Sequence, residues 1–225
     1  MSFYLRVYRQ RRKKILPKIF KKETQKPWMS YEEIEIIREL LLFLKPRNCL
    51  EWGAGYSTLF FPKYLGRRAE WASIEHEKTW AEKIKAVNKS KRVSIFHVEP
   101  NRFPWTDEHS DGAYADLKDY VNFPAGDKFD FILIDGRARA FCLEMAHKIL
   151  ADNGIVVLHD AEREYYHAPL NLYRNQMMLS SYNASENKLW IGSRDLDLND
   201  VVDITKYKIL WEKYKKLTAK SKRGH

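Results

Sequence analysis

The sequence is short of several features that mark whole classes of protein. It holds two cysteines in 225 residues, Cys49 and Cys142, which are too few for a disulfide framework or a zinc site. No apolar run approaches the roughly 18–20 residues of a membrane-spanning helix. The charged first residues lack the long apolar core of a secretory signal, and no internal repeat or low-complexity tract is present. These absences favour a cytoplasmic protein in a reducing environment.

Negative charge is scarce at the two ends of the chain. Residues 1–28 contain ten Lys and Arg and one acid, and residues 206–225 contain eight and one. The whole chain carries a net charge of +10, so the stretch between them is mildly acidic. This distribution makes nucleic acid a less favoured partner, because nucleic-acid platforms gather basic side chains on the domain itself.

We predict three parts: a basic arm over residues 1–28, a folded domain over 29–200, and a C-terminal helix with a basic tail over 201–225. A hydrophobic content of 44% and an aromatic content of 14% exclude general disorder. Residues 1–22 mix apolar and basic side chains. That pattern is typical of a basic amphipathic helix lying on an anionic membrane surface, and a solvated arm is the alternative.

Strand and helix patterns alternate through the domain. Ser30 and Glu33 form a capping box that begins a helix ending before Pro46. Five apolar segments predict strands, RNCLEWGAG, AEWASIE, RVSIFHV, FDFILIDG and GIVVLHD. Three helical segments lie between them, YSTLFFPKYLG, EKTWAEKIKAVN and RAFCLEMAHKIL. This alternation predicts an α/β fold with a doubly wound, mostly parallel sheet and helices on both faces.

Two further stretches of the domain stand apart from this alternation. Residues 99–128 form a long irregular piece, and loops of this length inside a compact domain usually have a function. The late runs around 177–183 and 188–194 predict an antiparallel hairpin.

Four of the expected strands end in polar residues. The endings are Glu51-Trp52-Gly53-Ala54-Gly55, Glu75-His76, Asp135-Gly136-Arg137 and His159-Asp160. In doubly wound sheets, ligands bind beyond the carboxyl ends of the strands. The sequence therefore predicts a ligand site built from these four endings.

The pattern resembles the class I S-adenosylmethionine-dependent methyltransferases over residues 48–160. Their first motif is an acid, any residue and then Gly-x-Gly, which matches Glu51, Gly53 and Gly55, with Ser57 in place of a third glycine. The resemblance implies a Rossmann-like methyltransferase with a seven-stranded sheet that includes an antiparallel strand near the C-terminus. A nicotinamide-binding Rossmann protein is the nearest rival, but this chain lacks its third glycine and has little room for its second half.

The resemblance implies S-adenosylmethionine as the cofactor. The residues that match its binding motifs are Glu51, Gly53, Gly55, Ser57, Thr58, Glu75 and His76. Glycines let the backbone approach the methionine portion, and the N–H groups near Ser57 and Thr58 suit its carboxylate. An acid about twenty residues after the glycines accepts hydrogen bonds from ribose hydroxyls, which is the position of Glu75.

The candidate catalytic residues are Asp135, His159 and Asp160. His159 is the first choice as general base, because its unperturbed pKa lies near neutrality, and a structural histidine at the strand end is the alternative. Asp135 and the His159-Asp160 pair also stand where enzymes resembling catechol O-methyltransferase hold magnesium. A histidine departs from that pattern, since hard metals prefer oxygen ligands, so a divalent metal is the minor alternative.

Aromatic and basic residues near these endings predict a small-molecule acceptor. The expected wall consists of Tyr114, Tyr120, Arg137, Arg139, Arg163, Tyr165, Tyr166 and His167. Such side chains suit saccharides and acidic small molecules, and the mixture faintly resembles O-methyltransferases of polysaccharide biosynthesis. The expected function is thus O-methylation of a saccharide or other small acceptor. The alternatives are an RNA or protein methyltransferase that uses the basic termini, and a non-catalytic binding protein of the same fold.

Overall fold

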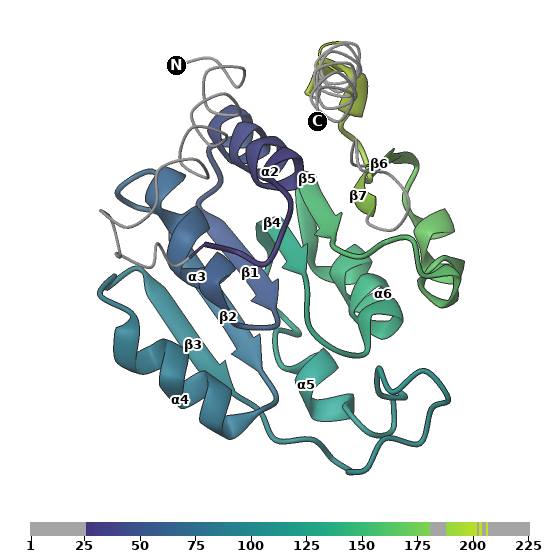
Figure 1. Cartoon of the computed structure of the whole chain (residues 1–225). Coiled ribbons are helices and arrows are strands. Elements are labelled where there is room, and N and C mark those ends of the chain that lie inside the picture. The colour runs from purple at the N-terminus through teal and green to yellow at the C-terminus, as the bar shows by residue number, and fades with distance from the viewer. Residues whose placement is uncertain (1–25, 181–187, 202, 204–205, 207–225) are drawn as a thin grey trace, which may run out of the picture.

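A computed structural model describes residues 26–180, 188–201, 203 and 206 (Figure 1). The predicted membrane-binding arm over residues 1–22 lies outside this part of the chain, as does nearly all of the predicted C-terminal helix and tail. Within the described residues, no helix combines the length and the apolar character needed to cross a membrane.

The centre of the fold is a seven-stranded sheet with the order β3-β2-β1-β4-β5-β7-β6. Its strands are β1 (Asn48–Trp52), β2 (Glu70–Glu75), β3 (Val93–His97), β4 (Phe129–Ile134), β5 (Leu150–Leu158), β6 (Asn175–Ser180) and β7 (Lys188–Ser193). Strands β1 to β5 pair in parallel, while β7 runs antiparallel to both β5 and β6. The predicted fold class, the late hairpin and the antiparallel strand are confirmed.

Helices pack on both faces of this sheet. They are α2 (Tyr31–Leu44), α3 (Tyr56–Phe60), α4 (Lys78–Val87), α5 (Lys118–Asn122) and α6 (Arg139–Ile149). Short 3₁₀ turns cover Phe61–Tyr64, Glu164–Tyr166, Ala168–Leu172 and Leu198–Asp200. The capping box predicted for Ser30 and Glu33 is present at the start of α2. Pro62 lies in the first of the 3₁₀ turns, so α3 is shorter than the helix expected over that segment.

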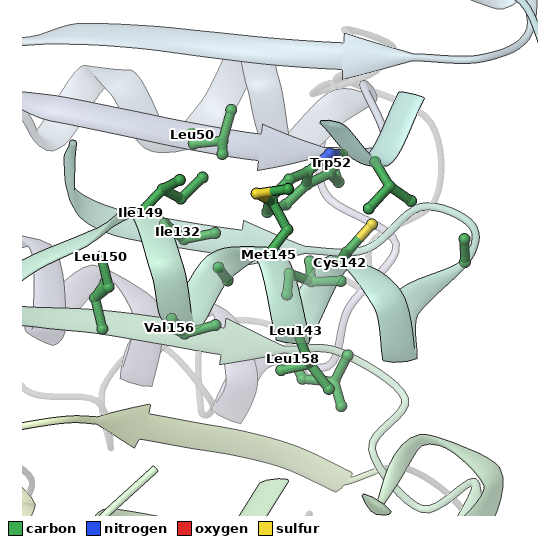
Figure 2. Packing of buried hydrophobic residues seen from close by; sticks show 14 of the residues in the cluster. Leu50, Trp52, Ile132, Cys142, Leu143, Met145, Ile149, Leu150, Val156 and Leu158 are labelled. Atoms are coloured by element: carbon green, nitrogen blue, oxygen red, sulfur yellow. The ribbon is translucent and has the colours of Figure 1, made fainter. Parts of the chain in front are cut away.

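The core has one apolar cluster on each side of the sheet, because side chains alternate along the buried strands. Phe131 and Leu133 of β4 join the cluster that includes α2 residues, such as Ile37. Ile132 of the same strand joins the other cluster, with Cys142 of α6 (Figure 2). Burial of both faces explains why these strands read as continuous apolar runs rather than alternating ones.

The piece over residues 99–128 is partly ordered into a helix, which the sequence did not predict. Helix α5 forms at its end because Tyr120 and Val121 are buried against the sheet. The preceding loop is held by an acid, since Asp116 Oδ2 accepts hydrogen bonds from Thr106 N at 2.8 Å and Ala113 N at 3.1 Å. Tertiary packing thus decided a helix where the composition favoured a loop.

Candidate functional site

The strand register brings the four predicted endings to one edge of the sheet. Trp52 of β1 pairs with Ile74 of β2 and with Ile134 of β4, and Ile134 pairs with Leu158 of β5. The residue after each of these positions therefore lies at the same level. These residues are Gly53, Glu75, Asp135 and His159.

A cavity of about 550 Å³ occupies this edge. Among the residues that line it are Gly53, Gly55, Ser57, Glu75, His76, Asp135, His159 and Asp160, all of which were predicted from the sequence. The four strand endings thus line one cavity, as the prediction requires. Three aromatic side chains also line the cavity and were not predicted, Trp28, Tyr56 and Trp80.

Gly53 is required by the close approach of two loops. Its φ is +97°, in the region that favours glycine, and a Cβ there would lie 2.6 Å from Gly136 Cα. Gly55 is different, because its backbone is extended and a Cβ would meet only Ser57 Oγ at 3.6 Å. Nothing in the described protein therefore demands glycine at position 55, and a requirement there would come from a ligand.

Glu51 and Thr58 flank the loop over residues 53–55, here called the glycine loop, and do not line the cavity. Glu51 is fully buried, and its carboxylate accepts hydrogen bonds from Ser57 Oγ and Thr58 Oγ1 at 2.5 Å and from Trp71 Nε1 at 2.9 Å. Burial raises the pKa of Glu51 to about 7, against the lowering effect of these donors. Glu51 and Thr58 thus lie outside the cavity, where their hydrogen bond connects the end of β1 to the start of α3.

Glu75 presents a carboxylate to the cavity from the end of β2. It is only 4% exposed, and its Oε1 accepts a hydrogen bond from Glu77 N at 2.9 Å and lies 2.9 Å from His76 Nδ1. Within the described part of the chain, Oε2 receives no hydrogen bond. One oxygen is therefore held by the loop, and the other remains for a ligand with hydroxyl groups.

Trp28, Tyr56 and Trp80 form an aromatic cluster at the glycine-loop side of the cavity. Their ring centroids lie 5.7–6.1 Å apart, and Trp80 Nε1 donates a hydrogen bond to Ala54 O at 2.6 Å. Trp28 is 78% exposed although it lines the cavity. No spacing in the sequence connects these three residues, so no local pattern could have identified the cluster.

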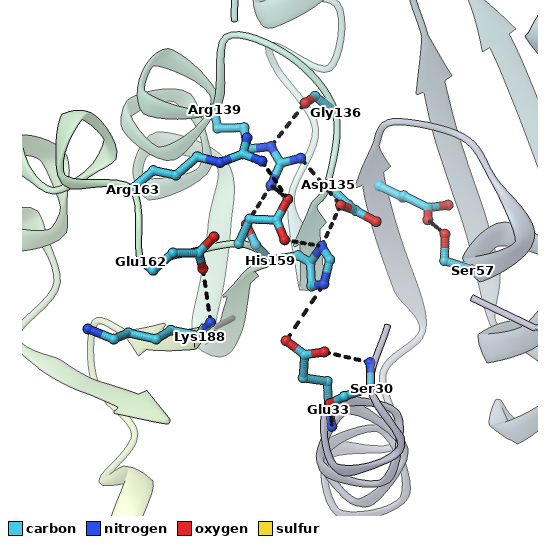
Figure 3. A network of polar contacts seen from close by, with 12 residues as sticks. Ser30, Glu33, Ser57, Asp135, Gly136, Arg139, His159, Glu162, Arg163 and Lys188 are labelled. Carbon is cyan, nitrogen blue, oxygen red and sulfur yellow. Dashed lines mark hydrogen bonds and ion pairs between the residues drawn. The ribbon is translucent and has the colours of Figure 1, made fainter. Parts of the chain in front are cut away.

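The candidate catalytic residues form a compact ionic cluster (Figure 3). His159 Nδ1 lies 2.8 Å from Asp135 Oδ1 and 3.4 Å from Asp160 Oδ1. Asp160 has a φ of +53°, an uncommon conformation outside glycine that is often found at functional sites. The three predicted residues are therefore brought together.

Two arginines neutralise the acids of this cluster. Arg139, which is 5% exposed, lies 3.5 Å from Asp135 Oδ1 and 3.3 Å from Asp160 Oδ2, and its Nη1 also donates to His159 O. Arg163 lies 3.2 Å from Asp160 Oδ2. Arg139 was expected only as a wall of the acceptor pocket, and its contacts make it the centre of the ionic cluster.

The cluster favours the charged forms of His159 and Asp135. Burial opposes the charge of His159, but the carboxylates of Asp135, Glu33 and Asp160 outweigh it and raise its pKa to about 10. Burial likewise raises the pKa of Asp135, but His159 and Arg139 outweigh that effect and hold it below its usual range. At neutral pH the site contains an imidazolium and an ionised Asp135.

The cluster does not fit a divalent metal, although its geometry is close to that of a metal site. The ligand atoms of Asp135, His159 and Asp160 lie within 4.8 Å of one another. However, a metal there would face the guanidinium groups of Arg139 and Arg163 and the charged His159. Two carboxylates already paired with three cations have little charge left for a hard metal ion, which prefers oxygen ligands.

Few residues of the expected acceptor wall line the cavity. Arg137 and Arg139 do so. Tyr120 is fully buried, and Tyr166 is buried with its hydroxyl donating to Asp111 Oδ1 at 2.9 Å. The other four do not line the cavity, Tyr114, Arg163, Tyr165 and His167. Much of the aromatic character near the strand endings is thus packing rather than ligand surface.

Comparison with known proteins shows a likeness in fold. No model of a protein family matches the sequence, and no curated protein matches it either. A methyltransferase from Geobacter sulfurreducens is 14% identical, with a TM-score of 0.56 over 87% of this chain and 98% of that chain. The O-methyltransferase TomG from Streptomyces achromogenes, which is involved in tomaymycin synthesis and whose structure contains SAM, is 15% identical. Its TM-score is 0.51 over 85% of this chain and 90% of that chain.

A third structure gives the same result. An O-methyltransferase from Bacillus cereus in complex with SAH is 15% identical, with a TM-score of 0.51 over 83% of this chain and 88% of that chain. The chain therefore has the fold of class I methyltransferases, as its motifs predicted. Because one fold can serve several chemistries, the function has to be argued from the site.

Proposed function

We propose that the protein is an S-adenosylmethionine-dependent methyltransferase that methylates an oxygen of a small-molecule acceptor, with a saccharide as the first candidate. The observation that carries this proposal is that one cavity joins two kinds of site. Glu75 and the glycine loop line one part of it, and the ionic cluster around Asp135 lines another. A donor and an acceptor can meet between them.

The residues of the first part fit S-adenosylmethionine. Glu75 offers a buried carboxylate oxygen for the ribose hydroxyls, and His76 lies beside it. Gly55 and Ser57 line the cavity where the methionine portion would approach the backbone. A Cβ at position 55 would meet only Ser57 Oγ at 3.6 Å, so the structure leaves room there for a ligand to approach the backbone.

The chemistry asks little of the chain beyond alignment and one proton transfer. When bound, the sulfonium donor supplies a methyl group to the acceptor oxygen, keeps the electron pair of the broken C–S bond and leaves as a neutral thioether. The chain must hold the acceptor in line with the methyl group and the sulfur, and this alignment can lower the activation free energy by up to about 7–11 kcal/mol. It must also take the hydroxyl proton, and general-base catalysis of this kind raises the rate by roughly 10²–10⁴-fold. The proposed residues for the second task are Asp135, His159 and Asp160.

A small acceptor suits the cavity better than a macromolecule. Its volume of about 550 Å³ is in the range of small-molecule sites, and Arg137 lines it beside the acidic residues. An arginine and carboxylates can bind the hydroxyl and acidic groups of a sugar. These features support a saccharide or another polar small molecule.

The test begins with donor binding and continues with transfer. Calorimetry should show binding of S-adenosylmethionine and of its demethylated product to the full chain, and Glu75→Gln should weaken both. Labelled methyl groups should then enter the small-molecule or glycan fraction of a cell extract. Absence of donor binding would refute the proposal, and label in RNA or protein instead would replace the proposed acceptor.

A further inference from the structure

An acid from outside the strand endings completes the ionic cluster. Glu33 belongs to the first turn of α2, and its Oε1 lies 3.6 Å from His159 Nε2 (Figure 3). Both side chains are buried, at 4% and 6% exposure. Neither of these two atoms has a hydrogen-bond partner within the described residues. These two atoms therefore face each other in a region shielded from water.

The capping box holds Glu33 in this orientation. Glu33 Oε2 accepts a hydrogen bond from Ser30 N at 2.7 Å, and Ser30 Oγ accepts one from Glu33 N at 3.2 Å. One carboxylate oxygen is therefore used by the helix start, and the other faces His159. A device that normally serves only to begin a helix here also directs a charge into the candidate site.

Both imidazole nitrogens of His159 consequently face carboxylates. Nδ1 faces Asp135 and, at a longer distance, Asp160, while Nε2 faces Glu33. Two arginines also lie beside these acids: Arg139 contacts Asp135 and Asp160 and donates to the backbone oxygen of His159, and Arg163 lies 3.2 Å from Asp160 Oδ2. Three acids around one ring favour an imidazolium, with a carboxylate facing each of its two nitrogens.

The geometry points to Glu33 as a positioning residue that keeps His159 as the charged partner of Asp135, so that Asp135 takes the proton of the acceptor. This inference rests on the proposed methyltransferase function and changes the expectation that His159 is the base. An imidazolium has no free electron pair with which to accept a proton. The acceptor hydroxyl proton would pass to a carboxylate oxygen of Asp135, and from there to water after product release.

The exposure of the side chains supports this division of roles. The side chain of Asp135 is 23% exposed, whereas that of His159 is 6% exposed. Asp135 can therefore contact an acceptor in the cavity while His159 stays behind it. His159 and Arg139 would stabilise the ionised form of Asp135 before the reaction and hold its orientation during it.

The first test measures the titration of His159 without donor or acceptor. In histidine ¹H–¹³C spectra assigned with a His159→Asn variant, His159 should stay protonated through pH 9. Glu33→Gln should lower its pKa by about one unit or more, because a carboxylate about 4 Å away commonly shifts a pKa by 1–3 units. Glutamine at this position still completes a capping box, so the helix start is kept. Glu32→Gln removes an acid from the same turn and should leave the titration of His159 unchanged.

The second test uses the pH dependence of methyl transfer. If Asp135 is the base, kcat should be nearly flat between pH 7 and pH 9, and in Glu33→Gln it should fall where His159 loses its proton. If His159 is the base, kcat should rise with pH by up to tenfold per unit, and Glu33→Gln should increase it at pH 7.

Several outcomes would overturn the inference. A rise of kcat with pH in the wild type would overturn it, and so would an unchanged His159 titration in Glu33→Gln. Circular dichroism and thermal unfolding would confirm that each variant is folded. Failure of donor binding refutes the proposed function and ends the catalytic part of the inference. The titration, which uses no ligand, would still report whether Glu33 and His159 are paired.

Discussion

The two parts of the cavity are built in different ways. The donor part comes from short loops, in which Glu75 is held by Glu77 N and Gly55 N donates to Thr58 Oγ1, so that partners lie two or three residues apart. The proton-transfer part joins α2 to the ends of β4 and β5, and Glu33 lies 126 positions before its partner His159. Local contacts therefore hold Glu75 and Gly55 in the proposed donor part, whereas the buried charge cluster is held by contacts between distant segments.

The two parts also treat charge differently. Glu75 keeps one carboxylate oxygen without a partner among the described residues. In the cluster, Asp135, Asp160 and Glu33 are each paired with at least one cation. A free oxygen suits ligand recognition, and a neutralised cluster suits control of a proton. Substitutions in the two parts should therefore separate binding from catalysis.

The largest effect is expected from Asp135→Asn. Removal of the proposed proton acceptor should lower kcat by about 10²–10⁴-fold, while the affinity for S-adenosylmethionine changes by only a few fold. Methyl-transfer kinetics and calorimetry measure the two quantities. Equal losses of kcat and of affinity for S-adenosylmethionine would contradict the separation of catalysis from donor binding between the two parts of the cavity.

The next effect compares two glycines of one loop. Gly53→Ala should lower the free energy of unfolding by about 2–4 kcal/mol, because of the positive φ and the approach to Gly136. Gly55→Ala should leave thermal stability nearly unchanged and weaken donor binding. Denaturant unfolding and calorimetry on both variants check this, and an equal loss of stability in Gly55→Ala would contradict the role given to position 55.

Glu75→Gln should have an intermediate effect that is confined to binding. Loss of a charged, buried acceptor should weaken S-adenosylmethionine binding by about 1–3 kcal/mol, with kcat at saturating donor nearly unchanged. Glu77→Gln is the matched control, since Glu77 caps α4 through Thr79 N and Trp80 N. The control should affect stability more than binding.

A smaller effect is expected in the pH dependence of stability. The pKa of His159 is raised to about 10, so its stabilising contribution is fully present below about pH 6.5 and is lost as the pH rises through 10. Glu33→Gln should therefore be less stable than the wild type at pH 7, by about 1.4 kcal/mol for each unit by which the His159 pKa falls. The difference should shrink as the pH approaches 10 and above. Denaturant unfolding from pH 6 to pH 10.5 measures it, and a difference that does not depend on pH would point to the helix start alone.

The smallest effect is expected from a chelator. Because Arg139, Arg163 and His159 already neutralise the two acids of the cluster, methyl transfer should be unchanged when divalent metals are removed with EDTA. Strong inhibition that added magnesium reverses would contradict the charge balance described above.

The sequence predicted most of the fold and several of the residues that line the proposed donor part of the cavity. Apolar runs that are buried on both faces identified the strands, and the capping box identified the start of α2. Helix α5 was missed because its formation depends on burial of Tyr120 and Val121 rather than on a local pattern. Among the site residues, Glu33 was recognised as a cap but not as part of the ionic cluster, and Trp28 was not recognised at all.

What the sequence determined by itself are features whose partners lie close along the chain: the order of strands and helices, the glycine loop, and the acid that ends β2. Backbone geometry and side-chain periodicity act over a few residues, so they can be predicted from short stretches of the sequence. The tertiary structure alone decided that Glu33, Asp135, Arg139 and His159 share one buried cluster. Electrostatic pairing in a region shielded from water depends on distance in space, which the spacing of residues along the chain does not record.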